Sequence, residues 1–241
     1  MKHCYEFKPV LWYHAPNLSR TINSERSVLS TTLSAQFSAE DLTCIRQDRC
    51  LFEGLSFSLN SGEILQVEGP NGAGKSSLLR ILAGFLHADH GQLQWKQQTI
   101  AKVEHEFLSD LLFIGHKAGI NPYLSALENV EFWLQLHAPE STTDVFELLG
   151  RLGLVGLEDI PISQLSAGQQ RKVALARLWL TPAKLWILDE PFTAIDKKGV
   201  IGLQKRFAQH LEADGMIILT THQDLTEHFD SLQRIRLEYQ F

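Results

Sequence analysis

The spacing of apolar residues along the chain predicts alternating strands and helices from Phe37 onward. Residues 55–59 alternate apolar and polar side chains, as a half-buried strand does, and a second apolar run follows a turn at Ser61 and Gly62. The predicted strands cover residues 55–59, 63–68, 111–114, 185–188, 216–219 and about 232–237. This order of elements predicts an α/β fold with a mainly parallel sheet.

Helix start and stop signals occupy the segments between these strands. Gly84 ends a predicted helix over residues 75–83, because glycine is favoured just past a helix C-terminus. The expected N-caps are Ser125 for residues 126–137, Thr142 or Thr143 for a helix through 152, and Ser166 for a long helix through 180. We therefore expect a helical subdomain at about 116–180, inserted between core strands, and one more helix near 197–213.

Residues 1–36 differ from the rest because they are rich in Ser, Thr and Asn and have no sustained apolar periodicity. They are predicted to be a disordered tail, or the result of a start codon assigned too early. The longest apolar run there covers residues 10–13, which is too short for a secretory signal. The remaining residues, 37–241, are predicted to form a single domain, because no internal repeat is visible.

Composition and charge narrow the possible partners. With 44% hydrophobic residues the chain has ample material for a core, while a net charge of −6 offers no basic field for nucleic acid. No apolar stretch approaches the roughly 20 residues of a membrane-spanning helix, so no direct membrane span is predicted. The three cysteines, Cys4, Cys44 and Cys50, form no CxxC pair and are interpreted as reduced structural thiols.

A glycine-rich segment, GPNGAGKS, begins at Gly69 directly after a predicted strand and leads into a predicted helix. Small residues let backbone N–H groups surround phosphates, while the helix presents its positive end to them. Lys75 is expected to reach the β and γ phosphates of ATP, and Ser76 to bind Mg²⁺. The alternative is a glycine turn that binds nothing, which leaves Lys75 without a purpose. The expected phosphate-binding residues are Gly69, Pro70, Asn71, Gly72, Ala73, Gly74, Lys75, Ser76 and Ser77.

Two acids and a histidine follow apolar strands whose carboxyl ends should meet at one edge of the sheet. Asp189 is the expected protein partner of Mg²⁺, and Glu190 the expected general base that polarises the attacking water. The alternative for Glu190 is a solvated acid at a strand end. His222 is expected at the same edge, with a hydrogen bond to the γ-phosphate.

A second anion site is predicted in the segment LSAGQ, residues Leu165, Ser166, Ala167, Gly168 and Gln169. Its helix N-terminus carries free N–H groups and a serine hydroxyl. The helical insert separates this site from Lys75 within one chain. We therefore expect a head-to-tail homodimer in which Ser166 of one copy closes over ATP held by Lys75 of the other, and in which hydrolysis loosens the pair.

These segments resemble the motifs of ATP-binding cassette proteins over residues 37–241: Walker A, signature, Walker B, D-loop and H-loop. Residues 68–84, 113–120, 165–180 and 185–196 look like the CcmA family of the bacterial cytochrome c maturation system. The resemblance implies a P-loop core with a small antiparallel β subdomain and an inserted helical subdomain. It also implies a haem-exporter ATPase, peripheral on the cytoplasmic side of the inner membrane, that works with integral membrane permease subunits.

Three positions depart from the general cassette pattern. The place of the adenine-stacking aromatic is taken by Arg46, and that of the Q-loop glutamine by His116. The D-loop keeps Asp196 but reads Thr-Ala-Ile-Asp. Apart from haem export, the sequence leaves open a transport ATPase for another cargo, a cassette ATPase that remodels a soluble cofactor-assembly complex, and an inert nucleotide sensor.

Overall fold

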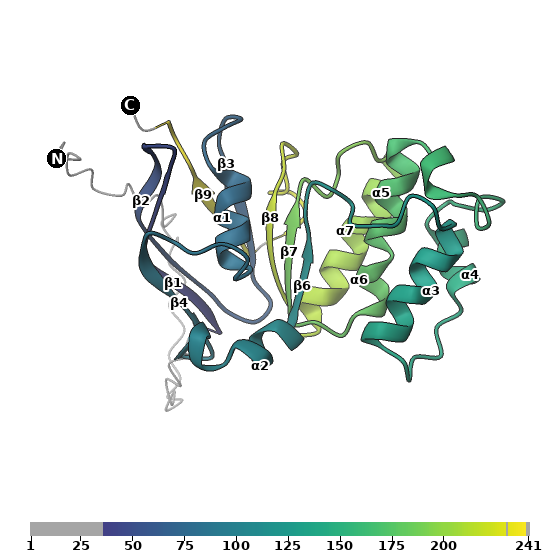
Figure 1. Cartoon of the computed structure of the whole chain (residues 1–241), viewed down its shortest axis with the longest axis horizontal. Coiled ribbons are helices and arrows are strands. Elements are labelled where there is room, and N and C mark those ends of the chain that lie inside the picture. Colours follow the sequence, from purple (N-terminus) through teal and green to yellow (C-terminus); the bar gives the residue numbers. More distant parts are fainter. Residues whose placement is uncertain (1–35, 230, 240–241) are drawn as a thin grey trace, which may run out of the picture.

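The computed structural model describes residues 36–229 and 231–239. The predicted disordered tail at 1–36 lies outside the described residues, apart from Gln36. The strands form two sheets, drawn side by side in Figure 1. The antiparallel sheet has the order β2-β1-β4-β5, with β1 Phe37–Arg46, β2 Arg49–Leu59, β4 His90–Trp95 and β5 Gln98–Thr99.

The parallel sheet has the order β6-β7-β8-β3-β9. Its strands are β3 Ile64–Glu68, β6 Leu111–Ile114, β7 Leu185–Asp189, β8 Met216–Thr220 and β9 Leu232–Arg236. Every residue of β7 and β8 is buried, as expected for parallel strands covered on both faces. Because successive side chains point to opposite faces, Ile187 and Ile218 pack on one side of this sheet, and Trp186 and Ile217 on the other.

Seven α-helices surround the sheets in the part of the chain that the structure describes. They are α1 Lys75–Leu82, α2 Glu104–Ser109, α3 Ala126–His137, α4 Val145–Arg151, α5 Ala167–Leu175, α6 Arg177–Leu180 and α7 Lys197–Glu212, with short 3₁₀ turns at Ile100–Lys102 and Ile162–Gln164. None of the helices described is both long and apolar enough to cross a membrane. The fold is therefore α/β with a parallel sheet, as predicted from the sequence.

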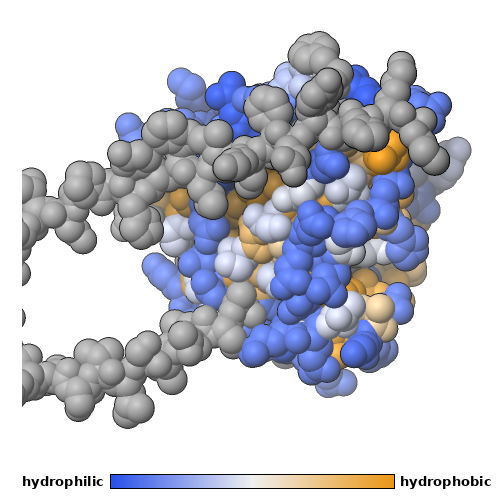
Figure 2. Space-filling model, turned by 90° about the vertical axis from the view of Figure 1, so that its left-hand side faces the viewer, coloured by the Kyte–Doolittle hydropathy of each residue, from blue (hydrophilic) through white to orange (hydrophobic). Residues whose placement is uncertain are grey.

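Three hydrophobic cores hold these layers together. One joins α1 to both sheets, for example through Leu78 and Phe37. A second packs α7 on the other face of the parallel sheet through Phe207. A third lies among α3 to α6 around Leu149 and Val173, at the far end of the molecule from the antiparallel sheet (Figure 1). Described residues on the side of the antiparallel sheet are mostly hydrophilic, with smaller hydrophobic areas between them (Figure 2).

The structure corrects several predicted boundaries. Helix α4 is capped by Asp144, whose carboxylate accepts from the backbone N–H of Glu147 at 3.1 Å, so the predicted cap at Thr142 or Thr143 is wrong. The long helix predicted from Ser166 is divided into α5 and α6 at Ala176. The prediction for Ser125 is confirmed, since it forms a reciprocal capping box at the start of α3. The strands β1, β4 and β5 of the antiparallel sheet and the short helix α2 were not among the predicted elements.

Candidate functional site

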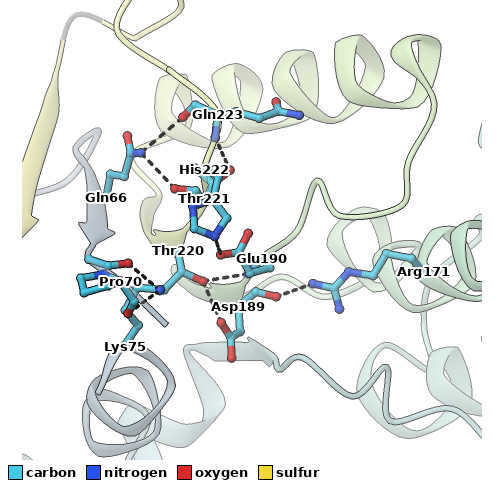
Figure 3. Close-up of polar contacts among 11 residues, drawn as sticks. Gln66, Pro70, Lys75, Arg171, Asp189, Glu190, Thr220, Thr221, His222 and Gln223 are labelled. Atoms are coloured by element: carbon cyan, nitrogen blue, oxygen red, sulfur yellow. Dashed lines mark hydrogen bonds and ion pairs between the residues drawn. The ribbon is translucent and has the colours of Figure 1, made fainter. Parts of the chain in front are cut away.

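The phosphate-loop segment connects β3 to α1 and is shaped by glycines. Gly69, Gly72 and Gly74 have φ values of 144°, 83° and 100°, a region that favours glycine. A Cβ atom at Gly69 would collide with the carbonyl oxygen of Leu237. The ammonium of Lys75 donates to the carbonyls of Gly69 at 2.7 Å and Pro70 at 3.2 Å (Figure 3). The loop thus places a cation beside the N-terminus of α1, an arrangement suited to an anion.

Asp189, the predicted Mg²⁺ ligand, and Glu190, the predicted general base, lie at the carboxyl end of β7, and a hydroxyl on the neighbouring strand joins them. Asp189 and Thr220 are opposite one another in the parallel pair β7 and β8. The Thr220 hydroxyl donates to Oδ1 of Asp189 at 2.7 Å and accepts from the backbone N–H of Glu190 at 2.9 Å (Figure 3). Glu190 has φ of 52°, an uncommon value for a residue with a side chain. This bridge therefore holds the backbone of Glu190 in a strained conformation.

His222 lies at the same edge of the sheet, as its position after β8 predicts. Its Nε2 is 3.4 Å from Oε1 of Glu190, and the imidazole is 71% exposed while the glutamate side chain is 18% exposed. The buried Gln66 of β3 donates to the carbonyls of Thr221 and Gln223 at 3.4 and 3.3 Å. These two contacts fix the turn that carries His222 over the acids (Figure 3).

A buried arginine ties the LSAGQ helix to this edge. Arg171 of α5 donates to the carbonyl of Asp189 at 2.6 Å and to that of Gly115 at 2.8 Å. Burial lowers the pKa of Arg171, and the nearby carboxylates of Asp189 and Glu190 oppose that shift. Gly115 immediately precedes His116, which is exposed in the loop after β6. Since β6 and β7 are parallel neighbours, this loop reaches the same edge as Asp189.

The LSAGQ segment caps its own helix. The Ser166 hydroxyl accepts from the N–H of Gln169 at 3.3 Å, and the Gln169 side chain accepts from the N–H of Ser166 at 2.8 Å. A Cβ atom at Gly168 would collide with the carbonyl of Ala194 in the D-loop. The serine O–H retains its donor capacity, because only its oxygen is engaged by the cap.

Asp196 ends the D-loop and begins α7. Its carboxylate accepts from the N–H of Gly199 at 2.7 Å and pairs with Lys172 of α5 at 2.9 Å. The backbone hydrogen bond from Gly199, followed by the Lys172 contact, lowers the pKa of Asp196. The structure thus links the D-loop to the LSAGQ helix within one chain.

Arg46 lies at the end of β1 in the hairpin with β2. Its guanidinium pairs with Asp89 at 2.9 Å and donates to the carbonyls of His87 at 2.8 Å and Ile45 at 2.6 Å. These contacts hold the group against the segment that precedes β4. Adenine stacking by Arg46 stays a prediction.

The structure does not bring the two predicted anion sites together. Figure 1 shows strands β6 to β8 between α1, which carries Lys75, and α5, which Ser166 caps. Among the residues described there is also no cluster of three His, Cys, Asp or Glu side chains that could hold a metal. Asp189 and Ser76 offer a carboxylate oxygen and a hydroxyl oxygen as candidate ligands. Mg²⁺ fits such a place, because it commonly binds through one or two carboxylates plus substrate phosphates.

Sequence reasoning missed three residues that build this edge: Thr220, Gln66 and Arg171. Arg171 stands two residues after the LSAGQ segment, and Thr220 two residues before His222, so both adjoin recognised motifs. Their roles depend on partners 18 to 56 residues away, which no local pattern reveals. Gln66 gives a weak signal, because it is a polar residue inside an apolar strand.

Comparison of the sequence with known proteins identifies the family of this chain. The family model described as ABC transporter matches residues 52–193. The curated protein named cytochrome c biogenesis ATP-binding export protein CcmA is 54% identical in Yersinia pestis (strain Nepal516), over 199 residues covering 83% of this chain and 91% of the relative. The Escherichia coli K12 protein of the same name is 53% identical over 199 residues, covering 83% and 95%.

Solved structures agree on the fold. An ABC transporter ATP-binding protein from Pyrococcus furiosus has a TM-score of 0.67 at 22% identity, covering 82% of this chain and 96% of that chain. An ATP-binding cassette solved as a dimer in a post-hydrolysis state with ADP and Pi has a TM-score of 0.71 at 21% identity, covering 85% and 97%. With its phosphate loop, acid pair and LSAGQ helix in this fold, the chain belongs to the ABC transporter family as an ATP-binding, ATP-hydrolysing subunit.

Proposed function

We propose that this chain drives a membrane export complex that serves c-type cytochrome biogenesis, and that haem is the exported group. The observation that carries the proposal is an identity above 50% to relatives named for cytochrome c biogenesis export, over more than four fifths of the chain. Haem as cargo rests on the resemblance of residues 68–84 and 165–180 to the CcmA family. Transport of another cargo and remodelling of a soluble assembly are the competing functions.

In this proposal the phosphates of ATP lie on the loop from Gly69 to Ser77. Lys75 neutralises the β and γ phosphates, and the N–H groups of the loop and of α1 surround them. Ser76 and Asp189 would hold Mg²⁺, which supplies positive charge where negative charge develops on the transferred phosphoryl group. The proposed role of Asp189 is supported by its hydrogen bond from Thr220, which orients the carboxylate.

Glu190 is the proposed general base for the attacking water. Its backbone is pinned by Thr220 and its carboxylate is 18% exposed, so it combines a fixed position with access to a water. His222, 3.4 Å from that carboxylate, is proposed to donate to the γ-phosphate and to orient the base. The loop with His116 and the D-loop with Asp196 are proposed to report the state of the site to neighbouring subunits.

The complete site is proposed to form between two copies in a head-to-tail dimer. This proposal is supported by the positions of α1, which begins at Lys75, and α5, which Ser166 caps, on opposite sides of β6 to β8 (Figure 1). Each copy would then contribute the LSAGQ helix N-terminus to ATP on the other, and cleavage of the γ-phosphate would weaken the pair. The membrane partners are proposed to be permease subunits contacted from the cytoplasmic side of the inner membrane.

Replacement of the relative in Escherichia coli tests the function. The full chain should restore covalent haem in periplasmic c-type cytochromes, measured by haem staining, and Lys75→Ala should abolish the rescue. Lys102→Ala, a matched change at an exposed lysine of a 3₁₀ turn, should rescue normally. Normal haem levels with Lys75→Ala would refute the proposal. Rescue failure by a chain that is active as an ATPase would favour another cargo.

Glu190→Gln tests the base and the dimer together. The variant should bind ATP, lose phosphate release, and elute as a dimer in size-exclusion chromatography with saturating MgATP. Undiminished hydrolysis would exclude Glu190 as the base. A variant that stays monomeric with saturating nucleotide in the presence of its permease would exclude the shared site.

A further inference from the structure

The segment after β9 runs along the phosphate loop. The N–H of Leu237 donates to the carbonyl of Glu68 at 2.8 Å, directly before the loop begins. Leu237 is buried at 4% exposure, and its carbonyl occupies the place that a Cβ atom at Gly69 would need. The chain after Leu237 is therefore held against the first residues of the loop.

Two residues later, Tyr239 extends this contact. Its hydroxyl donates to the carbonyl of Asn71 in the phosphate loop at 2.5 Å. The residue is 41% exposed, so part of its ring surface is open to solvent. The hydroxyl hydrogen bond at one end and the buried, hydrogen-bonded Leu237 two residues earlier in the chain restrict where the ring can lie.

The β1–β2 hairpin approaches the same ring. Gln47 and Asp48, at its turn, have φ values of 51° and 59°, and the strand β2 begins immediately afterwards at Arg49. The guanidinium carbon of Arg49 lies 5.1 Å from the centre of the Tyr239 ring. Figure 1 shows β2 and the end of β9 on the same side of α1. An aromatic ring and a guanidinium plane thus lie together beside the loop.

ATP bound by its phosphates must place its adenosine next to the loop. Adenine has an extended π-face, and stacking on aromatic or guanidinium planes is the common way in which proteins hold such a base. Arg46 is turned to other partners, since its N–H groups contact Asp89, His87 and Ile45. Tyr239 is the aromatic side chain that a hydrogen bond connects to the loop.

We infer that Tyr239, with Arg49 against its ring, is the stacking platform for the adenine of ATP. The inference rests on the proposed phosphate site at Lys75 and adds the base-recognition residue to it. The hydrogen bond from the Tyr239 hydroxyl to Asn71 fixes the distance between the ring and the phosphate loop. The adenine and the phosphates of one ATP molecule can therefore be bound at the same time. Tyr239 is thereby a binding residue contributed by the segment after β9 rather than by the β1–β2 hairpin.

Equilibrium binding of ADP and of pyrophosphate, both with Mg²⁺, separates base from phosphate recognition without hydrolysis. In the full chain, Tyr239→Ala should weaken ADP by about 5- to 150-fold, the range for loss of one stacked base. Pyrophosphate should change by less than about twofold, because it has no base. Tyr239→Phe should keep most of the ADP affinity, since the ring remains. Tyr123→Ala, at a tyrosine 87% exposed beside α3, is the matched control and should alter neither ligand.

Several outcomes would overturn the inference. They are unchanged ADP affinity in Tyr239→Ala, equal weakening of ADP and pyrophosphate, a loss in Tyr239→Phe as large as in Tyr239→Ala, or a selective ADP loss found in Arg46→Ala instead. Lys75→Ala distinguishes this failure from failure of the phosphate site. If the loop binds phosphates, Lys75→Ala weakens both ligands. If pyrophosphate affinity is unaffected by that change, the phosphate site itself is misplaced.

Discussion

The hydroxyl of Thr220 offers the most direct test of how this fold holds Asp189 and the proposed general base Glu190. Thr220 is fully buried, and its single oxygen donates to Asp189 and accepts from the N–H of Glu190. Thr220→Val keeps the shape of the side chain but removes both hydrogen bonds. The change leaves a buried carboxylate oxygen short of a donor and a backbone N–H without an acceptor.

Each buried polar group left without its partner costs about 1–3 kcal/mol, so the two together should lower the free energy of unfolding by about 2–6 kcal/mol. For a domain of this size, a loss of about 3 kcal/mol corresponds to a fall in Tm of roughly 6–12 °C. Activity should suffer separately. Glu190 has φ of 52°, and without the hydrogen bond its backbone is free to relax and move the carboxylate. A displacement of the base by about 1 Å would lower kcat by about 100-fold.

Thr220→Ser is the matched control, because it keeps the hydroxyl and loses only a methyl group, which costs about 1 kcal/mol. Urea unfolding and steady-state phosphate release measure the two effects in the same preparations, and ADP affinity verifies that the phosphate loop is intact. We expect Thr220→Ser to retain near-normal kcat while Thr220→Val does not. If the valine variant is as stable and as active as the serine variant, the hydroxyl bridge does not position the acids and the reasoning is refuted.

Two further predictions concern packing and pH. Gly168→Ala should displace the D-loop from the LSAGQ helix, because its Cβ would collide with the carbonyl of Ala194; we expect a loss of about 1–3 kcal/mol in thermal unfolding and reduced ATPase activity. Gly202→Ala in α7 is the control, since apart from its chain neighbours and the backbone of its own helix no atom lies within 4 Å of the added Cβ, and it should gain roughly 0.5–1 kcal/mol; equal behaviour of the two variants would contradict the steric argument. Burial, and then the charge of Arg206, lower the pKa of His210 from 6.5 to about 4 in the folded chain. Between pH 6.5 and pH 4 the unfolded chain therefore binds a proton at His210 that the folded chain does not bind. Stability should therefore fall by up to about 3 kcal/mol as the pH drops from 6.5 to 4, and His210→Phe should remove this part of the pH dependence of urea midpoints; an unchanged slope in the variant would argue against a neutral buried His210.

Local sequence signals determined the features whose physics involves only neighbouring residues. The phosphate loop was recognisable because strand, glycines, Lys75 and helix follow one another within a few residues. The Ser125 cap was predictable for the same reason, since the capping box with Glu128 spans four positions. Buried parallel strands such as β7 and β8 are visible as apolar runs, because both of their faces need apolar side chains.

The sequence left the start of α4 ambiguous, because neighbouring residues gave competing N-cap signals. Thr142, Thr143 and Asp144 are three adjacent residues that are all suited to an N-cap. Packing of α4 into the helical core through Leu148 and Leu149 decides where the helix can begin, and this selects Asp144. The choice depends on residues from other helices, so no pattern within the segment expresses it.

Tertiary structure alone decided how the candidate site is assembled. Thr220 meets Asp189 only because β7 and β8 are parallel neighbours in that register, and Arg171 meets Gly115 only because α5 packs behind the same sheet edge. Tyr239 reaches Asn71, 168 positions away, because β9 pairs with β3 directly before the phosphate loop. The sequence by itself named the groups that we propose to bind phosphate and activate water, because they occur in short motifs. The sequence did not show that the Thr220 hydroxyl, the Arg171 guanidinium and the Tyr239 ring lie beside those motifs, because their long-range contacts exist only in the folded chain.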